Sequence, residues 1–202
     1  MRLVFATGNK GKMNEIREIM EDSGYEIISM KEAGIDTDIE EDGTTFEENA
    51  LIKARAVQKL LPDDLVLADD SGLCIDALGG EPGIYSARYL GHDTPYSVKN
   101  AELIRRLEGK EGSERSARFV CAIAAVFPDG TEKCVKATIE GQIGYEEKGE
   151  HGFGFDPIFY VPELGCTTAE IPEEEKNKIS HRGKALRLMK RELLAHESTD
   201  SK

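Results

Sequence analysis

The sequence contains no tryptophan and only four cysteines among its 202 residues. Cys74, Cys121, Cys134 and Cys166 form no Cys-x-x-Cys pair, and their spacing does not suit a zinc site. Three of them stand among apolar neighbours, and free cysteines of that kind are commonly buried. We therefore expect reduced, mainly structural thiols rather than a zinc centre.

Long hydrophobic runs are also absent. None approaches the roughly 18 apolar residues that a membrane-spanning helix needs. The apolar stretch after Arg2 is four residues long, and no small-residue cleavage site of a secretory signal follows it. We expect a cytoplasmic protein without a membrane partner. Hydrophobic residues still make up 39 % of the chain, enough to bury a core in one domain or in two closely joined lobes.

Positive charge is in deficit. The chain has 26 lysines and arginines against 39 aspartates and glutamates, a formal net charge of −13. Proteins that wrap nucleic acid need a surplus of Lys and Arg for the phosphates, so we expect no nucleic-acid partner. A small anion remains compatible with this charge, because local lysines or a divalent cation can reverse the field inside one cleft.

The segment LVFATGNKGK, residues 3–12, is the first local feature of interest. A short apolar run ends in a Thr/Gly/Asn turn with two lysines, and a helical pattern follows up to Gly24. Backbone N–H groups at a helix start, the helix dipole and two ammonium groups suit a phosphate. Met13 stands where a Walker loop has Ser or Thr, so this is not a Walker loop. An ordinary helix cap with solvated lysines is the alternative.

Strands and helices alternate along the rest of the chain. Apolar spacing predicts helices from Thr44 to Leu61 and from about Pro95 to Leu107, with Thr44 and Glu47 as a capping box for the first. Residues 118–127 and 132–139 predict a hairpin, central in a sheet that is covered on both faces. A last helix is expected to begin near Ser180, and the polar tail, residues 196–202, is expected to fray.

Two acidic segments flank the first of these helices: EEDG at residues 40–43 and ADDSG at residues 68–72. The second follows a predicted buried strand, Leu65–Ala68, so its acidic pair is expected at a strand end. Carboxylates from separate elements, completed by waters and phosphates, commonly hold Mg²⁺ and can activate an attacking water. The alternative is a solvated acidic face, which suits ADDSG less because apolar residues bracket it.

Two later segments could recognise a nucleotide base. HGFGFDP, residues 151–157, contains Phe153, which could stack on a base with about 1 to 3 kcal/mol, although filling of the core is equally compatible. KNKISHRGKA, residues 176–185, provides Lys176, His181 and Arg182, whose donors could read an oxo group or hold a phosphate. A basic helix end is the alternative for this second segment.

In their order along the chain, six segments resemble the inosine triphosphate pyrophosphatase family, also called the Ham1 or RdgB family of dITP/XTP pyrophosphatases. They are FATGNKGK, EEDGTTFEENALIKA, LADDSGL, LGGEPGIYSARY, GFGFDPIF and EKNKISHRGKAL, and they cover nearly the whole chain. The resemblance implies an α/β fold: a long, twisted, mixed sheet with helices on both faces, forming two lobes around a central cleft. It further implies a single domain over residues 1–202 and a homodimer.

The same resemblance implies Mg²⁺-dependent hydrolysis of ITP, dITP and XTP to the monophosphate and pyrophosphate. By matching motifs, Asp70 would be the catalytic base and a metal ligand, with Glu41 as the second ligand. The other matched positions bind substrate. The phosphates would meet Thr7, Gly8, Asn9, Lys10, Gly11, Lys12 and Lys53, with Ser71 also touching substrate. The base and sugar would meet Phe153, Gly154, Phe155, Asp156, Lys176, His181 and Arg182. His151 departs from the family pattern, which often has glycine there.

Two other functions remain open. One is a house-cleaning pyrophosphatase of different base preference, such as the Maf type, which acts on modified pyrimidines or methylated nucleotides. The other is a non-catalytic module that binds nucleotides or RNA. The net negative charge disfavours RNA, and clustered carboxylates are poorly suited to a pure phosphate binder.

Overall fold

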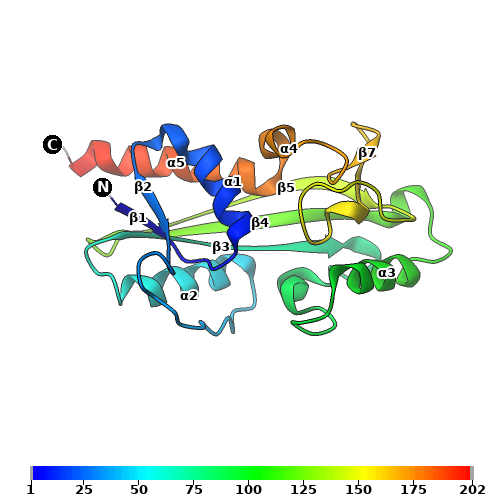
Figure 1. Cartoon of the computed structure of the whole chain (residues 1–202), viewed down its shortest axis with the longest axis horizontal. Helices are drawn as coiled ribbons and strands as arrows, with labels where there is room; N and C mark the ends of the chain where they lie inside the picture. The colour runs from blue at the N-terminus through cyan, green and yellow to red at the C-terminus, as the bar shows by residue number, and fades with distance from the viewer. Residues whose placement is uncertain (1, 201–202) are drawn as a thin grey trace. The chain divides into compact units, whose positions relative to one another are not determined.

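The structure, a computed structural model, describes residues 2–200. Helices and strands alternate in the first half of the chain, whereas in the second half several strands and then two helices follow one another (Figure 1). The elements are β1 (Arg2–Phe5), α1 (Lys10–Met20), β2 (Glu26–Ser29), α2 (Phe46–Gln58), β3 (Leu65–Ile75), α3 (Tyr96–Arg106), β4 (Ser116–Val126), β5 (Glu132–Ile143), β6 (Phe159–Val161), β7 (Cys166–Thr167), α4 (Glu173–Ile179) and α5 (His181–Asp200). Within residues 2–200, no helix is both long enough and apolar enough to span a bilayer.

The strands form a mixed seven-stranded sheet in the order β2-β1-β3-β4-β5-β6-β7. β1 pairs in parallel with β2 and β3, whereas β6 pairs antiparallel with β5 and β7. β4 and β5 are joined by a tight turn in which the Phe127 amide donates to the Thr131 carbonyl at 2.9 Å. The predicted mixed α/β fold with a central hairpin is confirmed. Of the two strands of the hairpin, β4 is buried on both faces, whereas β5 alternates between exposed and partly covered residues over much of its length.

The chain divides into two compact units. Of the described residues, the first unit contains 2–70, 121–137 and 182–200, and the second contains 71–120 and 138–181. Strands β3, β4 and β5 contribute residues to both units. The expected cleft between two lobes stays a prediction.

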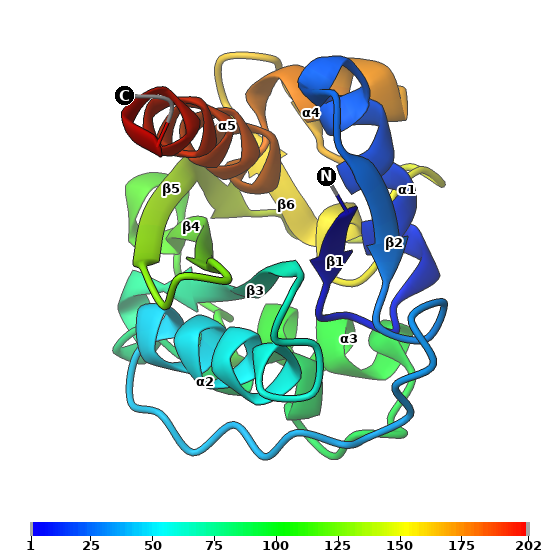
Figure 2. The same ribbon diagram turned by 90° about the vertical axis from the view of Figure 1, so that its left-hand side faces the viewer.

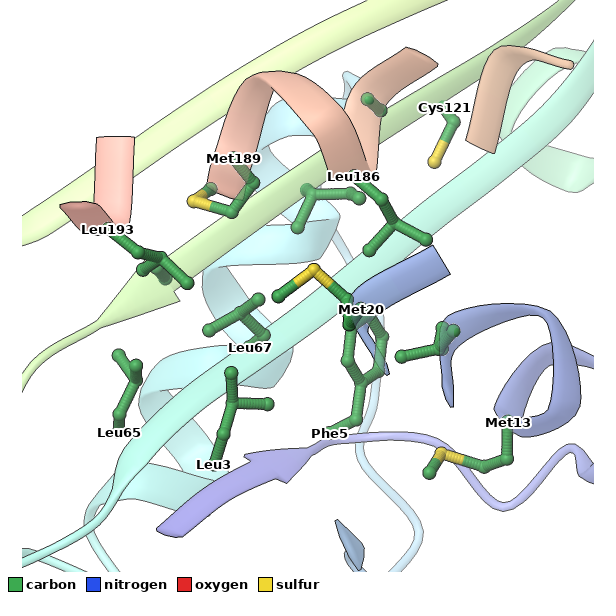
Figure 3. Close-up of a cluster of buried hydrophobic side chains, with 14 of the residues drawn as sticks. Leu3, Phe5, Met13, Met20, Leu65, Leu67, Cys121, Leu186, Met189 and Leu193 are labelled. Atoms are coloured by element: carbon green, nitrogen blue, oxygen red, sulfur yellow. The ribbon is translucent and has the colours of Figure 1, made fainter. Parts of the chain in front are cut away.

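The core of the first unit lies on both faces of its strands, because successive strand residues point to opposite sides. On one face, Leu3 and Phe5 of β1 pack with side chains of α1 and α5, such as Met20 and Leu186 (Figure 3). On the other face, Val4 packs with α2. Figure 2 shows α1 and α5 on one side of β1 and β3 and α2 on the other. Helices therefore cover both faces, as expected.

The second unit has its own core, to which β3 contributes Leu73 and Ile75 and α3 contributes Leu103. All three side chains are fully buried. Because this apolar pattern continues beyond the acidic pair, β3 runs without interruption from Leu65 to Ile75. Asp69 and Asp70 therefore lie in the middle of a strand, and the prediction that they lie at a strand end was wrong.

The start of α2 differs by one residue from the predicted capping box. Thr45 is the N-cap, and its hydroxyl accepts from the Glu48 amide at 3.1 Å. Thr44, the expected cap, instead donates its amide and hydroxyl to the Glu48 carboxylate, at 2.6 and 2.8 Å. The chain thus uses the Thr45/Glu48 pair because Thr44 lies one residue too early to face the first helical turn.

The C-terminal segment also differs from the expectation of a frayed tail. α5 continues to Asp200, which includes residues 196–200 of that segment, and residues 201–202 lie outside the described part. The His196 ring lies 3.8 Å from the Phe127 ring, centroid to centroid, and the Tyr25 hydroxyl donates to Glu197 at 2.5 Å. These contacts hold the last turns of the helix against the first unit.

Candidate active site

The turn before α1 has the local geometry of an anion site. Asn9 is the N-cap, and its side-chain oxygen accepts from the Lys12 amide at 3.1 Å. The Thr7 hydroxyl in turn accepts from the Asn9 amide at 3.2 Å. The first helical turn contains no acidic residue, so the helix dipole and the two lysines add with the same sign. Space beside Gly8 is open, because a Cβ placed there would meet no atom within 4 Å.

Lys12 is held by the buried carboxylate of Asp69. Its ammonium lies 2.9 and 3.1 Å from the two oxygens of Asp69, which is 1 % exposed. Burial alone would raise the pKa of the Asp69 carboxyl. Lys12 and Arg182 outweigh burial, so that pKa lies below its usual value and Asp69 stays ionised. Asp69 is thus an ion-pair partner rather than a proton acceptor.

Arg182 lies in the first unit and is 3 % exposed. Its guanidinium forms an ion pair with the buried carboxylate of Glu15 on α1, and its Nε lies 3.5 Å from Asp69. Two buried carboxylates thus pair with the charge of Arg182, which connects the start of α5 to α1 and β3. A guanidinium has five N–H donors, so the donor to a base that the resemblance implies at Arg182 stays a prediction.

Asp70 lies beside Asp69 on β3 but has different surroundings. Its side chain accepts a hydrogen bond of 3.1 Å from the amide of Asn49, and the residue is 7 % exposed. Burial raises the pKa of the Asp70 carboxyl to about 6; the Lys53 charge opposes this shift and the Glu41 charge adds to it. A carboxylate with a pKa near the working pH can accept a proton from water.

Asn49 is a site residue that sequence reasoning missed. It is fully buried, and besides its bond to Asp70 its side-chain oxygen accepts from the Gly43 amide at 2.9 Å. A Cβ on Gly43 would lie 2.6 Å from that oxygen, so the close approach needs glycine. Asn49 therefore links the EEDG segment, through Gly43, to Asp70 on β3. Its position four residues before Lys53, on the same helix face, was an available signal.

Glu41 and Lys53 complete this cluster. The Lys53 ammonium lies 3.3 Å from the Glu41 carboxylate, and both side chains are partly exposed, whereas Glu40 is exposed. Glu41 and Asp70 supply the hard oxygen ligands that suit Mg²⁺. Across residues 2–200, no group of three or more His, Cys, Asp or Glu side chains forms a ready-made metal site. The donor set thus fits a Mg²⁺ ion that keeps several waters and arrives with substrate phosphates.

In the second unit, Asp156 anchors the loop that contains Phe153. The Asp156 carboxylate, 3 % exposed, accepts from the Phe153 amide at 2.9 Å, from the Thr168 hydroxyl at 2.8 Å and from the Lys176 ammonium at 2.7 Å. Gly152 has φ +72°, and a Cβ there would lie 2.2 Å from the same carboxylate. The loop therefore wraps one buried anion, and Thr168 is a partner that no sequence motif indicated.

The two phenylalanines of this loop have separate roles. Phe153 is 39 % exposed, and the Lys176 ammonium lies 5.2 Å from its ring centroid. Phe155 is 5 % exposed and packs edge-to-face on Tyr96 at 5.1 Å. Phe155 therefore fills the core, which is the alternative that the sequence left open for this segment. The Phe153 ring is partly exposed, and its stacking on a base stays a prediction.

The remaining predicted positions lie on the two units as follows. His181, 8 % exposed, stacks on Phe119 in the second unit with ring centroids 4.8 Å apart. Ser71 follows Asp70 on β3 and is partly exposed, while Lys10 is exposed at the start of α1. The His151 amide donates to the Ala169 carbonyl at 2.9 Å. Between residues 2 and 200, Leu90 is the one non-glycine residue whose φ is positive. The φ of His151 is therefore negative, and its position does not require glycine.

Known proteins resemble this chain over nearly its whole length. The sequence profile of the Ham1 family matches residues 3–192. The dITP/XTP pyrophosphatase of Bacillus subtilis (strain 168) is 47 % identical over 192 residues, covering 95 % of this chain and 96 % of that protein. The protein of the same name from Desulforamulus reducens is 49 % identical over 187 residues, covering 93 % and 92 %.

Solved structures give the same result. The Ham1 protein of Staphylococcus aureus superposes with a TM-score of 0.86 at 43 % identity, over 97 % of this chain and 100 % of that one. A HAM1 protein from Coxiella burnetii gives a TM-score of 0.87 at 40 % identity, over 96 % and 99 %.

Proposed function

The chain belongs to the Ham1 family, and we propose that it is a Mg²⁺-dependent nucleoside-triphosphate pyrophosphatase that converts ITP, dITP and XTP to the monophosphate and pyrophosphate. Such an enzyme would remove non-canonical purine nucleotides from the cytoplasmic pool. The observation that carries the proposal is the buried Asp70 carboxylate, oriented by Asn49 and placed beside Lys53 and Glu41.

In this mechanism Asp70 accepts a proton from the water that attacks the α-phosphorus. The new bond forms between the water oxygen and phosphorus, and the bond from that phosphorus to the α,β-bridging oxygen breaks, so pyrophosphate leaves with the bond electrons. The hydrogen bond from Asn49 keeps the carboxylate in one orientation during this transfer. The pKa of Asp70, raised to about 6, lets the group be mostly ionised at neutral pH and still bind a proton.

The phosphates would be held by the turn from Thr7 to Lys12 and by Lys53. An ammonium group has three N–H donors, so Lys12 can bond to Asp69 and still donate to a phosphate. Asp70 and Glu41 would hold the Mg²⁺ ion, which when bound neutralises phosphate charge and polarises the reacting phosphorus. An acidic chain can thereby bind a tetra-anion.

In this proposal the base is recognised mainly by side chains of the second unit. Phe153 would stack on the purine, with Lys176 over the ring and Asp156 holding the loop. Hypoxanthine and xanthine present an acceptor at position 6, where adenine presents an amino donor. Donors from His181 and Arg182, as the resemblance implies, would therefore bond to the first two bases and be mismatched with adenine.

A panel of triphosphates tests the proposal. The purified protein is incubated in Mg²⁺ with ITP, dITP, XTP, ATP, GTP and a methylated pyrimidine triphosphate, and pyrophosphate and orthophosphate are measured separately. We expect pyrophosphate from the first three, little from ATP, and none in EDTA or with Asp70→Asn. Preferential hydrolysis of methylated or modified pyrimidine nucleotides would instead indicate the Maf-type activity, and binding without hydrolysis would indicate a nucleotide-binding module.

We also propose that the protein acts as a homodimer. Three large apolar side chains of the second unit that lie close together in the sequence are exposed: Tyr85, Leu90 and Val98. Exposed apolar side chains that form one patch are typical of a protein–protein interface. Light scattering coupled to size exclusion should give twice the 22.3 kDa of one chain. Leu90→Asp should reduce that mass if this surface is the interface.

A further inference from the structure

The inner face of α3 contains a buried amide that none of the roles above uses. Asn100 is 1 % exposed. Its side-chain nitrogen donates to the Glu147 carboxylate at 2.6 Å and to the Gly154 carbonyl at 3.3 Å. Both partners can only accept, so the amide must present its NH₂ group to them and a flipped amide would lose both bonds. Asn100 is therefore a donor to the centre of the Phe153–Asp156 loop.

Tyr96, one helical turn earlier on the same face of α3, contacts the same loop. Its ring packs edge-to-face on Phe155, with centroids 5.1 Å apart and planes at 86°. Gly154 has φ +68°, and a Cβ there would lie 3.5 Å from the Tyr96 ring. The Lys99 ammonium lies 4.8 Å from the ring centroid and donates to the Ala87 carbonyl at 2.8 Å. Lys99 thus packs on the Tyr96 ring, which in turn supports the loop.

Two groups therefore hold the loop from opposite ends. Asp156 binds the Phe153 amide on one side of Gly154, and α3 contacts the Gly154 carbonyl and the Phe155 ring. Phe153 is the exposed residue between these anchors. The side-chain oxygen of Asn100 is buried and accepts no hydrogen bond from residues 2–200. An unsatisfied buried acceptor opposes folding, and the two hydrogen bonds donated by the same amide offset that cost.

We propose that Asn100 is a positioning residue for base selection: through the Gly154 carbonyl it holds the loop so that Phe153 presents its ring to the purine. This inference rests on the proposed function, because it assumes that Phe153 stacks on a base. Asn100 and its partners Glu147 and Gly154 belong to the second unit, whereas the phosphate turn and Asp70 belong to the first. Its loss should therefore affect KM and base discrimination and leave kcat nearly unchanged.

Asn100→Asp is the main test, since a carboxylate can donate to neither partner. We expect KM for ITP to rise about 10-fold, kcat to change less than about 2-fold, and the preference for ITP over ATP to shrink by a similar factor. Ser97→Asp is the matched control, because it adds the same charge at an exposed position of α3. The milder Asn100→Ser should change KM in the same direction, and thermal melts show which variants are folded.

A second comparison separates loss of the Gly154 bond from repulsion by Glu147. In Asn100→Asp/Glu147→Gln, the new amide can donate to the new carboxylate and the like charges are gone. Stability should recover, but KM should stay high because the Gly154 carbonyl still lacks its donor. Recovery of KM in this double variant would overturn the proposal and assign the effect to charge repulsion.

Loop order can be measured without any substrate. The chain contains six tyrosines but no tryptophan, so Phe153→Trp introduces a single tryptophan at the loop tip that can be excited selectively at long wavelength. Adding Asn100→Asp to it should lower the steady-state anisotropy of that fluorophore, whereas adding Ser97→Asp should leave it unchanged. Unchanged anisotropy with Asn100→Asp would overturn the inference. This readout needs no turnover, so failure of the proposed enzymatic activity would be seen separately, in the triphosphate panel.

Discussion

At the scale of single residues, the neighbours Asp69 and Asp70 illustrate how surroundings decide the chemistry of a carboxylate. Both are buried side chains on β3. Lys12 and Arg182 outweigh burial at Asp69 and lower the pKa of its carboxyl. Burial outweighs Lys53 at Asp70 and raises the pKa of its carboxyl to about 6. One aspartate is therefore a permanent anion, while the other can exchange a proton near neutral pH.

Asp70→Asn should abolish turnover and yet stabilise the metal-free protein at neutral pH. Because the pKa of Asp70 rises from 3.8 to about 6 on folding, ionising this group above pH 6 opposes folding by up to about 3 kcal/mol. A neutral amide avoids this penalty. In EDTA, urea denaturation should show the variant more stable than the parent at about pH 8 and equal to it below about pH 4. If the variant were no more stable than the parent at about pH 8, ionisation of Asp70 would not oppose folding as expected.

Asp69→Asn should have the opposite effect on stability. The pKa of Asp69 is lowered on folding, so this group contributes stability above its usual pKa, and that contribution is lost as the pH falls. Removing the charge leaves Lys12 and Arg182 without their shared buried partner. We expect a loss of about 3 kcal/mol in the free energy of unfolding at neutral pH, measured by urea denaturation. If the Asp69 and Asp70 variants had equal free energies of unfolding, Lys12 and Arg182 would not stabilise the ionised Asp69 carboxylate in the way expected here.

At the scale of elements, two glycines in the loop before β6 differ in how closely their backbone approaches a neighbouring side chain. Gly152 and Gly154 both have positive φ, at +72° and +68°. A Cβ on Gly152 would lie 2.2 Å from the Asp156 carboxylate, whereas one on Gly154 would make an ordinary contact with Tyr96 at 3.5 Å. Backbone conformation restricts both positions, but close packing restricts only the first.

Gly152→Ala and Gly154→Ala are therefore a matched pair. Each alanine must adopt positive φ, at a cost of roughly 1 to 2 kcal/mol. Only Gly152→Ala must also displace Asp156 from Lys176 and from the Phe153 amide. We expect Gly152→Ala to raise KM for ITP about 10-fold more than Gly154→Ala does, and to lower the melting temperature further. If both variants changed KM and the melting temperature equally, the positive φ alone, and not the contact with Asp156, would explain the need for glycine at position 152.

At the scale of the whole molecule, charge limits the partners. A chain with net charge −13 repels polyanions, although local lysines at the start of α1 can still hold a compact one. The protein should therefore bind a labelled DNA or RNA oligonucleotide no better than about 100 µM at physiological salt. Fluorescence anisotropy measures this. A micromolar or tighter complex would restore the RNA-associated module as a candidate.

The sequence by itself determined the fold class, the family and several of the elements. Helices α1 and α2 follow from apolar spacing and polar caps, which act within a few residues and can be read locally. The candidate residues follow from six motifs in a fixed order, which is far more specific than any one of them. The one-residue error at the cap of α2 shows the limit, since adjacent threonines offer the same local chemistry.

Only the tertiary structure decided which side chains become partners. Lys12 meets Asp69 across 57 positions of sequence, and Arg182 meets Glu15 across 167. Asn49 reaches Asp70 across 21 positions, and Asn100 reaches Gly154 across 54. Burial and long-range pairing set the charge of Asp69 and Asp70 and the orientation of the Phe153 loop. Neither leaves a periodic trace in the sequence, because the groups that meet lie on different elements and only the fold brings them together.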